Sequence, residues 1–235
     1  MQKTALVTGG ARGIGAATVR TLARDGFRVF IGYCKSEEQA LFLAEETGGI
    51  PLCADVRDEH QVSEMFSKAG GVDVLVNNAG VAGYGLFTDI SREIWRDIFS
   101  VNVDGTFYCT KCALPHMIRQ KDGVIINISS IWGMVGASCE TAYSASKAAI
   151  IGLTKALAKE TGPSGIRVNC IAPGVIDTEM NSALSADDIA ELKNQTPLGQ
   201  IGTPDDIGEL IRYLASPCAR FITGQVISPN GGFVI

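Results

Sequence analysis

Histidine is scarce in this chain of 235 residues, which contains only His60 and His116. A Ser–His–Asp hydrolase needs a histidine beside its nucleophile. His60 lies at the polar start of one predicted helix and His116 at the end of another, so neither follows a predicted strand. We therefore expect no histidine-based hydrolysis from this chain.

An excess of basic residues and a long apolar segment are also absent. Lys and Arg number 20 against 25 Asp and Glu, and the formal net charge of −5 disfavours nucleic-acid or anionic-membrane binding. No apolar run approaches the ~18 residues that cross a bilayer, and the first residues resemble a strand rather than a signal peptide. We expect a cytoplasmic protein with no membrane and no nucleic-acid partner.

The seven cysteines are an odd number scattered through apolar segments, which does not suggest a disulfide framework. Cys109, Cys112 and His116 have the C-x2-C-x3-H spacing of part of a zinc site, but no second pair of ligands follows. The surrounding segment, Trp95–Met117, has the periodicity of an amphipathic helix. We therefore expect these residues to pack in the core and predict no metal site.

The length and the 46% of apolar residues predict a single domain over residues 1–235. Short β-branched runs alternate with helix-length segments, and several runs are apolar throughout, as in strands covered on both faces. The predicted strands are Thr4–Val7, Val29–Gly32, Ile50–Cys53, Val72–Asn77, Val124–Ile128, Ile166–Ile171 and Val226–Ser228. This order predicts an α/β fold: a doubly wound, Rossmann-like parallel sheet with helices on both faces. The long connection at residues 175–202 is predicted to be a substrate lid.

A glycine-rich turn, TGGARGIG at residues 8–15, follows the first predicted strand and opens a helix that runs to about Asp25. Glycines let the backbone approach a phosphate, and a helix start offers free N–H groups and the positive end of a dipole. The turn therefore predicts a phosphate-binding site, and the alternative is an ordinary tight connection.

The end of the second predicted strand lacks the acid with which NAD-preferring folds hold the ribose 2′-hydroxyl. The segment Tyr33–Ser36 stands there, and the first carboxylate is Glu37. Lys35 and Arg12 are placed to reach a 2′-phosphate, to which a cation makes a charge-assisted hydrogen bond. This favours NADP(H) over NAD as the cofactor, and the alternative is that both cations are solvated surface charges.

Tyr143 and Lys147 lie four residues apart in TAYSASKAA, which places both side chains on one face of a helix. A carbonyl reduction needs a proton donor near the forming alkoxide as well as a hydride from a cofactor. The ordinary pKa of tyrosine is about 10, and a neighbouring ammonium would lower it. We predict that Tyr143 is the general acid and that Lys147 lowers its pKa, although the spacing alone also arises by chance.

Further motifs follow the predicted strands: Asp55-Val56, Asn77-Asn78-Ala79-Gly80, Ser129-Ser130 and Pro173-Gly174. With the glycine turn, Asn102 and the Tyr143–Lys147 pair, they make the whole chain resemble the short-chain dehydrogenase/reductase family. The resemblance implies four catalytic residues. Tyr143 is the acid and Lys147 also bonds the nicotinamide ribose, while Ser130 donates to the substrate oxygen and Asn102 holds a water.

The same resemblance implies a cofactor site along the carboxyl edge of the sheet. Asp55 would bond the adenine, Asn78 and Gly80 would line the nucleotide cleft, and Pro173–Thr178 would contact the nicotinamide end. The full implied set is Gly9, Arg12, Gly13, Ile14, Gly15, Tyr33, Lys35, Asp55, Val56, Asn78, Ala79, Gly80, Tyr143, Lys147, Pro173, Gly174, Ile176 and Thr178. Two alternatives stay open: Asn78 as scaffold rather than ligand, and Ser129 in place of Ser130, which the family register favours.

The length, the glycine turn and the ending Gly224–Gly232 resemble bacterial 3-oxoacyl-acyl-carrier-protein reductases. This implies a ketone substrate on an acidic carrier protein and a homotetramer, which the small-residue-rich helix predicted at Thr141–Thr161 also fits. The segment Pro163-Ser164 departs from that pattern, because those reductases frequently carry a basic residue at this place. Arg119 and Lys121 remain as docking charges.

A second resemblance, to reductases of 5-aminopentanone attached to elongation factor P, comes from the segments Ser130–Met134 and Ala137–Glu140. It suggests that Trp132, Met134 and Glu140 line the substrate mouth, where Glu140 would favour an amine-bearing substrate. The alternative is loop packing and a solvated acid. In another class, the chain would be a non-catalytic NADP-sensing protein, against which the four catalytic residues argue.

Overall fold

The computed structural model describes residues 2–181 and 185–235 and contains the predicted parallel sheet. Its seven strands lie in the order β3-β2-β1-β4-β5-β6-β7, and every neighbouring pair is parallel. The strands are β1 Thr4–Thr8, β2 Arg28–Tyr33, β3 Ile50–Cys53, β4 Val74–Asn77, β5 Gly123–Ile128, β6 Ile166–Ile171 and β7 Val226–Ile227. The predicted doubly wound fold is confirmed.

Two apolar cores cover the two faces of the sheet, because neighbouring residues of a strand point to opposite faces. In β1, Val7 belongs to one core and Leu6 to the other, and in β5, Ile126 and Ile125 divide in the same way. All six residues of β5 are buried. This explains why the central strands are apolar throughout rather than alternating.

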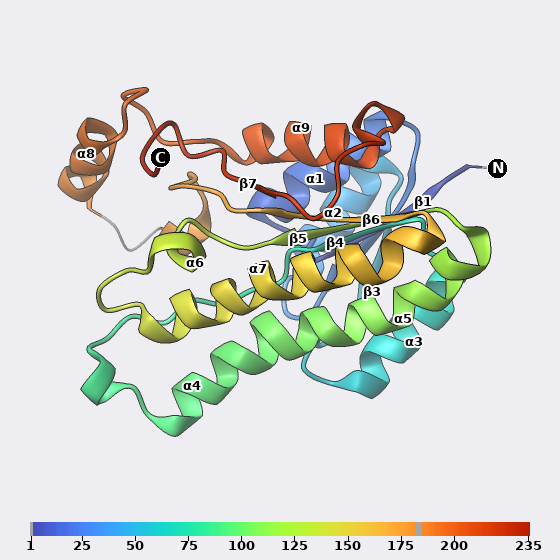
Figure 1. Ribbon diagram of the computed structural model, residues 1–235, viewed down its shortest axis with the longest axis horizontal. Coiled ribbons are helices and arrows are strands. Elements are labelled where there is room, and N and C mark those ends of the chain that lie inside the picture. The colour runs from blue at the N-terminus through green and yellow to red at the C-terminus, as the bar shows by residue number, and fades with distance from the viewer. Residues whose placement is uncertain (1, 182–184) are drawn as a thin grey trace.

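The helices form a layer on each face of the sheet (Figure 1). One layer holds α1 Gly13–Arg24, α2 Glu37–Thr47 and α9 Pro204–Ala215. The other holds α3 Glu59–Ala69, α4 Arg92–Phe99, α5 Gly105–Gln120 and α7 Thr141–Thr161. The short α6, Trp132–Val135, and α8, Ala186–Gln195, lie together at one end of the molecule, where β5 and β6 finish (Figure 1). Among the described residues, no helix is both long enough and apolar enough to span a bilayer.

The segment predicted as one helix over Trp95–Met117 is interrupted. Between α4 and α5, residues Ser100–Asp104 form a π-helical turn that contains Asn102. Cys109 is buried in the core on α5, and Nε2 of His116 lies 3.2 Å from Oδ1 of Asp73. Within residues 2–181 and 185–235, no cluster of three side chains is arranged as metal ligands.

The predicted lid contains a helix that the sequence analysis did not anticipate. Residues 182–184 of it lie outside the described residues, but α8 follows them with a capping box made by Ser185 and Asp188. Only Ile189 and Leu192 of α8 are half-buried, and its other residues are exposed. The strand order reverses between β1 and β4, which places a crevice at their carboxyl ends, the side on which α6 and α8 lie.

Candidate active site

The turn between β1 and α1 has a backbone that only glycines allow. Gly9 and Gly13 have positive φ angles of 60° and 49°. A Cβ on Gly15 would lie 2.2 Å from the carbonyl oxygen of Gly9. Gly15 therefore packs directly against the turn, and the N–H groups at the start of α1 are of the kind that bind a pyrophosphate.

Asn78 steadies this turn. Its Nδ2 donates to the carbonyl oxygens of Thr8 and Gly9, both at 3.0 Å, and Oγ1 of Thr8 accepts from the N–H groups of Asn78 and Ala79. Nδ2 of Asn78 is therefore bonded to the scaffold, and the residue also lines the cleft described below. Gly80 follows, and a Cβ there would lie 3.2 Å from Nζ of Lys147.

Of the two cations expected at the 2′-phosphate, Arg12 lines a pocket beside the phosphate turn and Lys35 is not among the residues that line it. Lys35 is exposed just after Tyr33, the last residue of β2. Arg12 forms an ion pair with Glu179, a partner that the sequence analysis did not predict. Arg12 is thus already paired, while the end of β2 carries Lys35 and no carboxylate, which fits the 2′-phosphate of NADP(H) better than the ribose hydroxyl of NAD.

Asp55 is held by Arg57, which the sequence analysis missed although it lies only two residues away. Both carboxylate oxygens of Asp55 accept from Arg57, whose Nη2 lies 2.6 Å from Oδ2, and this lowers the pKa of Asp55. Arg57 also reaches Oδ1 of Asp97 at 2.7 Å. Val56 packs against Gly105, where a Cβ would lie 2.8 Å from its Cγ2. An adenine at Asp55 would therefore meet a carboxylate that is already paired.

Tyr143 and Lys147 lie on the buried side of α7, as the spacing predicts. Nζ of Lys147 is 5.6 Å from the centre of the Tyr143 ring and donates to the carbonyl oxygen of Ile128 at 2.9 Å. Burial lowers the pKa of Lys147 to about 8, because a charged ammonium is costly in an apolar environment.

The predicted lowering of the Tyr143 pKa is wrong. Burial raises it to about 12, the carboxylate of Glu140 raises it further, and a hydrogen bond with Ser130 opposes them. Removing the phenolate from water outweighs any effect of Lys147. Tyr143 is therefore protonated at neutral pH, the form that a proton donor needs.

The two serines after β5 have different partners. Oγ of Ser129 donates to the carbonyl oxygen of Lys147 at 2.8 Å, which ties β5 to α7. Oγ of Ser130 accepts from the N–H of Trp132 at 3.2 Å and lies beside Tyr143. Both serines line the cleft, but only the hydroxyl of Ser129 is bonded to α7, and Ser130 lies beside Tyr143.

Asn102 joins three elements from within the π-helical turn. Its Oδ1 accepts from the N–H of Val81 at 2.8 Å, and its Nδ2 donates to O of Val81 at 3.0 Å and to Oγ of Ser146 at 2.9 Å. The residue is 1% exposed. Its side chain thus fixes the loop after β4 against α7, one residue before Lys147.

A cleft of about 600 Å³ gathers these groups at the carboxyl ends of the strands. Ser130, Tyr143 and Lys147 line it together with Ile14, Asn78, Gly80, Pro173, Gly174, Ile176 and Thr178. The N–H of Gly174 donates to O of Pro229 at 3.0 Å, so the C-terminal segment supports this wall.

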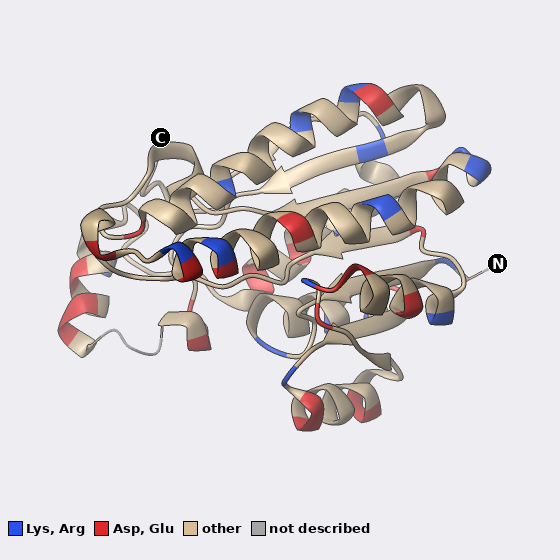
Figure 2. Ribbon diagram, turned by 90° about the horizontal axis from the view of Figure 1, so that it is seen from below, with Lys and Arg blue, Asp and Glu red and all other residues tan. Residues whose placement is uncertain are grey.

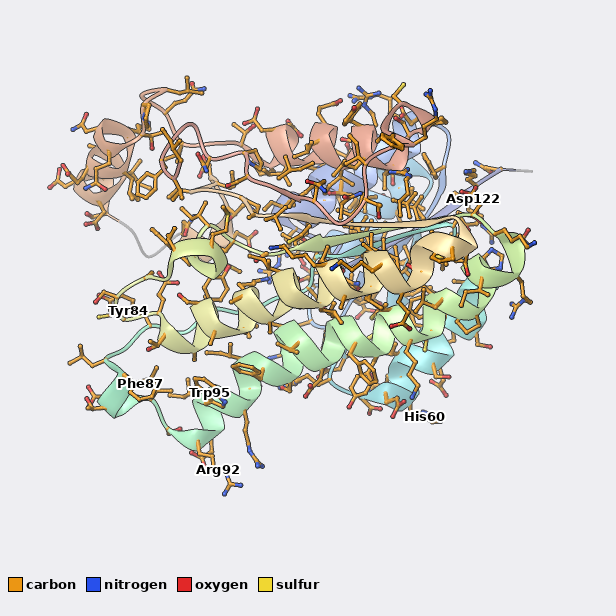
Figure 3. All side chains as sticks on the ribbon, viewed as in Figure 1. His60, Tyr84, Phe87, Arg92, Trp95 and Asp122 are labelled. Atoms are coloured by element: carbon orange, nitrogen blue, oxygen red, sulfur yellow. The ribbon has the colours of Figure 1, made fainter. Side chains whose placement is uncertain are left out.

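Aromatic and acidic side chains form the outer part of the cleft. Trp132 and Glu140 line it, and the ring of Phe233 packs edge-on against Trp132. Tyr84, which the sequence analysis missed because no motif marks its loop, stands at the same end of the molecule (Figure 3). Burial raises the pKa of Glu140. Met134 is 44% exposed on α6 and does not line the cleft among the described residues.

Arg119 and Lys121 do not lie at the mouth of this cleft, contrary to their predicted role. They flank the C-terminus of α5, directly before β5 begins, and so lie at the opposite edge of the sheet. Figure 3 shows Asp122, the next residue, at the far end of the molecule from Tyr84. Acidic positions, coloured red in Figure 2, begin α8, where Asp187 and Asp188 lie in the first turn. A carrier docked at this chain's own cleft would not meet Arg119 or Lys121.

Comparison with known proteins finds similar reductases. A family model described as enoyl-(acyl carrier protein) reductase matches residues 9–234. The 3-oxoacyl-(acyl-carrier-protein) reductase FabG of Staphylococcus aureus is 41% identical, covering 99% of this chain and 98% of that protein. That of Thermotoga maritima is 40% identical over the same shares.

A solved structure is also similar. The crystal structure of 3-oxoacyl-(acyl-carrier protein) reductase from Brucella melitensis superposes with a TM-score of 0.95 at 32% identity, covering 99% of this chain and 92% of that one. Together with the glycine turn, the buried tyrosine–lysine pair and the parallel sheet, these matches establish that the chain is an oxidoreductase of the short-chain dehydrogenase/reductase family.

Proposed function

We propose that the protein reduces a ketone to a secondary alcohol with NADPH and that Tyr143 supplies the proton. The observation that carries this proposal is the burial of Tyr143, Ser130 and Lys147 together at the floor of one cleft. The cofactor, when bound, supplies the hydride. Ser130 donates a hydrogen bond to the substrate oxygen, and Tyr143 passes its proton to that oxygen as the alcohol forms.

The other residues of the floor hold this pair in place. Lys147 brings a positive charge beside the phenol and bonds the nicotinamide ribose, and Asn102 fixes the helix that carries both. The glycine turn at residues 9–15 takes the pyrophosphate, and Lys35 and Arg12 take the 2′-phosphate. Asp55 and Val56 lie at the adenine, and Pro173–Thr178 at the nicotinamide.

The test is steady oxidation of NADPH by the purified protein with a simple β-ketoester. Turnover that requires the ketone supports the reductase. NADPH binding without turnover for any ketone would favour the non-catalytic NADP-sensing alternative.

For the substrate, we propose first a 3-oxoacyl group on a carrier protein. This proposal is supported by the relatives that are 40–41% identical over nearly their whole length, because they are named as reductases of this substrate. The largely exposed Tyr84 and Met180 line the outer part of the cleft, which leaves room for a substrate tethered to a larger partner.

A second candidate is a ketone that carries an amine, such as 5-aminopentanone attached to elongation factor P. The half-buried Glu140 favours it, because a carboxylate among the rings of Tyr84, Trp132 and Tyr143 suits an ammonium group. Turnover of acetoacetyl-carrier protein and of the modified elongation factor, measured on the same preparation, decides between the two substrates.

We also propose a homotetramer, and the substrate lid at residues 175–202 stays a prediction. The outer side of α7 exposes small residues, Ala148, Gly152 and Ala156, and α5 beside it exposes Phe107 and Ile118. Small residues allow a second helix to approach closely. Sedimentation of the full chain tests the assembly state.

A further inference from the structure

A carboxylate from the segment after β6 already holds one of the two cations expected at the 2′-phosphate. Arg12 directly precedes α1, and its guanidinium pairs with Glu179, the first residue of the 3₁₀-helix Glu179–Asn181. The pair links the phosphate turn to the predicted lid, 167 residues apart in the chain. The proposed reduction assigns no role to Glu179, so the contact needs its own explanation.

Hydrogen bonds within the segment hold the backbone around Glu179, and one close approach links that segment to the phosphate turn. Nδ2 of Asn181 donates to O of Ile176 at 2.7 Å, and its N–H donates to O of Thr178 at 3.0 Å. A Cβ on Gly13 would lie 3.3 Å from Cγ2 of Thr178. Glu179 therefore extends from a fixed turn beside Gly13, within reach of Arg12.

The pocket beside this ion pair offers an incoming phosphate little free positive charge. It has a volume of about 420 Å³, and its charged lining residues are Arg12, Arg20, Glu38 and Glu179. Nε and Nη2 of Arg20 each bond the carboxylate of Glu46 at 2.8 Å. A phosphate monoester carries about −1.5 to −2 charges at neutral pH, so it would compete with Glu179 for Arg12.

We propose that Glu179 is a latch on the cofactor site: it occupies Arg12 until the 2′-phosphate of NADPH displaces it. This inference rests on the proposed NADPH dependence. The exchange pairs Arg12 with the phosphate and frees Glu179, so occupancy of the phosphate site is sensed at the 3₁₀-helix Glu179–Asn181. NADH has a neutral 2′-hydroxyl and does not displace the latch.

The variant Glu179→Gln removes the competing charge and keeps the length of the side chain. We expect its Kd for NADPH, measured by the fluorescence of the bound reduced nicotinamide, to fall about three- to fivefold, the range of an exposed ion pair, and its Kd for NADH to change less than about twofold. The control Glu191→Gln makes the same charge change on α8, where Glu191 bonds Gln195. It should leave both dissociation constants unchanged.

A double-mutant cycle separates the latch from general electrostatics. In an Arg12→Gln background, Glu179→Gln should no longer alter NADPH affinity, because the contested cation is gone. Unchanged NADPH affinity in Glu179→Gln alone, or weaker binding of both cofactors, would overturn the latch. A wild-type protein that binds NADH more tightly than NADPH would instead contradict the proposed function, so the two failures are distinguishable.

Discussion

The floor and the mouth of the cleft are built in opposite ways. On the floor, Asn102, Ser130, Tyr143 and Lys147 are at most 8% exposed, and each has a polar partner in the protein. At the mouth, Tyr84 is 84% exposed and Met180 55%. The floor is fixed by packing and hydrogen bonds, whereas the mouth is free to vary without unfolding the sheet.

This difference separates the reaction from the choice of substrate. Groups that perform chemistry must be held in one geometry, and burial in a crowded core achieves that. Groups that recognise a substrate need only a surface of suitable charge and shape. We therefore expect changes on the floor to remove turnover with every substrate and changes at the mouth to alter the ranking of substrates.

Lys147→Met should have the largest effect, because it removes the ammonium beside Tyr143. We expect turnover to fall by at least ~100-fold with any ketone, the low end of an acid–base contribution. Steady-state reduction of two unrelated ketones checks this. If turnover fell with only one of the two ketones, Lys147 would affect the choice of substrate, and the division of roles between floor and mouth would be wrong.

The same variant should be more stable than the wild type at pH 7. The pKa of Lys147 is about 8 in the folded state and 10.5 ordinarily, so the unfolded state binds more protons between these values. Below pH 8 the buried ammonium of Lys147 therefore destabilises the folded state by its full amount. This destabilisation decreases as the pH rises toward 10.5. After allowing for the lost bond to Ile128, a gain of about 2 kcal/mol is expected in denaturant unfolding.

The pH dependence of reduction tests whether the charge of Lys147 is needed for the reaction. Lys147 loses its proton above pH about 8, while Tyr143, with a pKa of about 12, keeps its own. We expect kcat/KM to be level below pH 8 and to fall about tenfold per unit well above it. Circular dichroism at each pH controls for unfolding. A profile that is level to pH 10 would contradict the role given to Lys147.

Glu140→Gln, at the mouth, should have the smallest effect and a selective one. If the substrate carries an ammonium group, its KM should rise about tenfold or less, as for one charge-assisted hydrogen bond, while kcat for a neutral ketone stays unchanged. Glu93→Gln, an exposed acid at the start of α4, is the matched control. If turnover of neutral and amine-bearing ketones fell equally, Glu140 would contribute to the reaction itself and not to the choice of substrate.

The strands were predictable from sequence because their apolar runs are local signals. The predicted bounds of β3 and β6 agree with the structure, and those of the other strands agree to within two residues. The Tyr143–Lys147 face of α7 follows in the same way from helical spacing. The residues Ile166–Ile171, for example, need no distant contact to be recognised as a covered strand.

Features that depend on distant contacts were not predictable. The π-helical turn at Asn102 coincides with side-chain bonds to Val81, 21 residues away, so a helical pattern alone does not reveal it. The direction of the Tyr143 pKa shift depends on burial by elements that the sequence does not place. The Arg12–Glu179 pair joins the two halves of the sheet and has no local signal.

The most direct test of the central claim is Tyr143→Phe, which removes one buried hydroxyl and keeps the ring. The NADPH dissociation constant and the single-turnover rate of ketone reduction should be measured on one preparation. We predict an NADPH affinity within about twofold of wild type and a reduction rate lower by at least ~100-fold. A near-normal rate with intact NADPH binding would contradict Tyr143 as the proton donor.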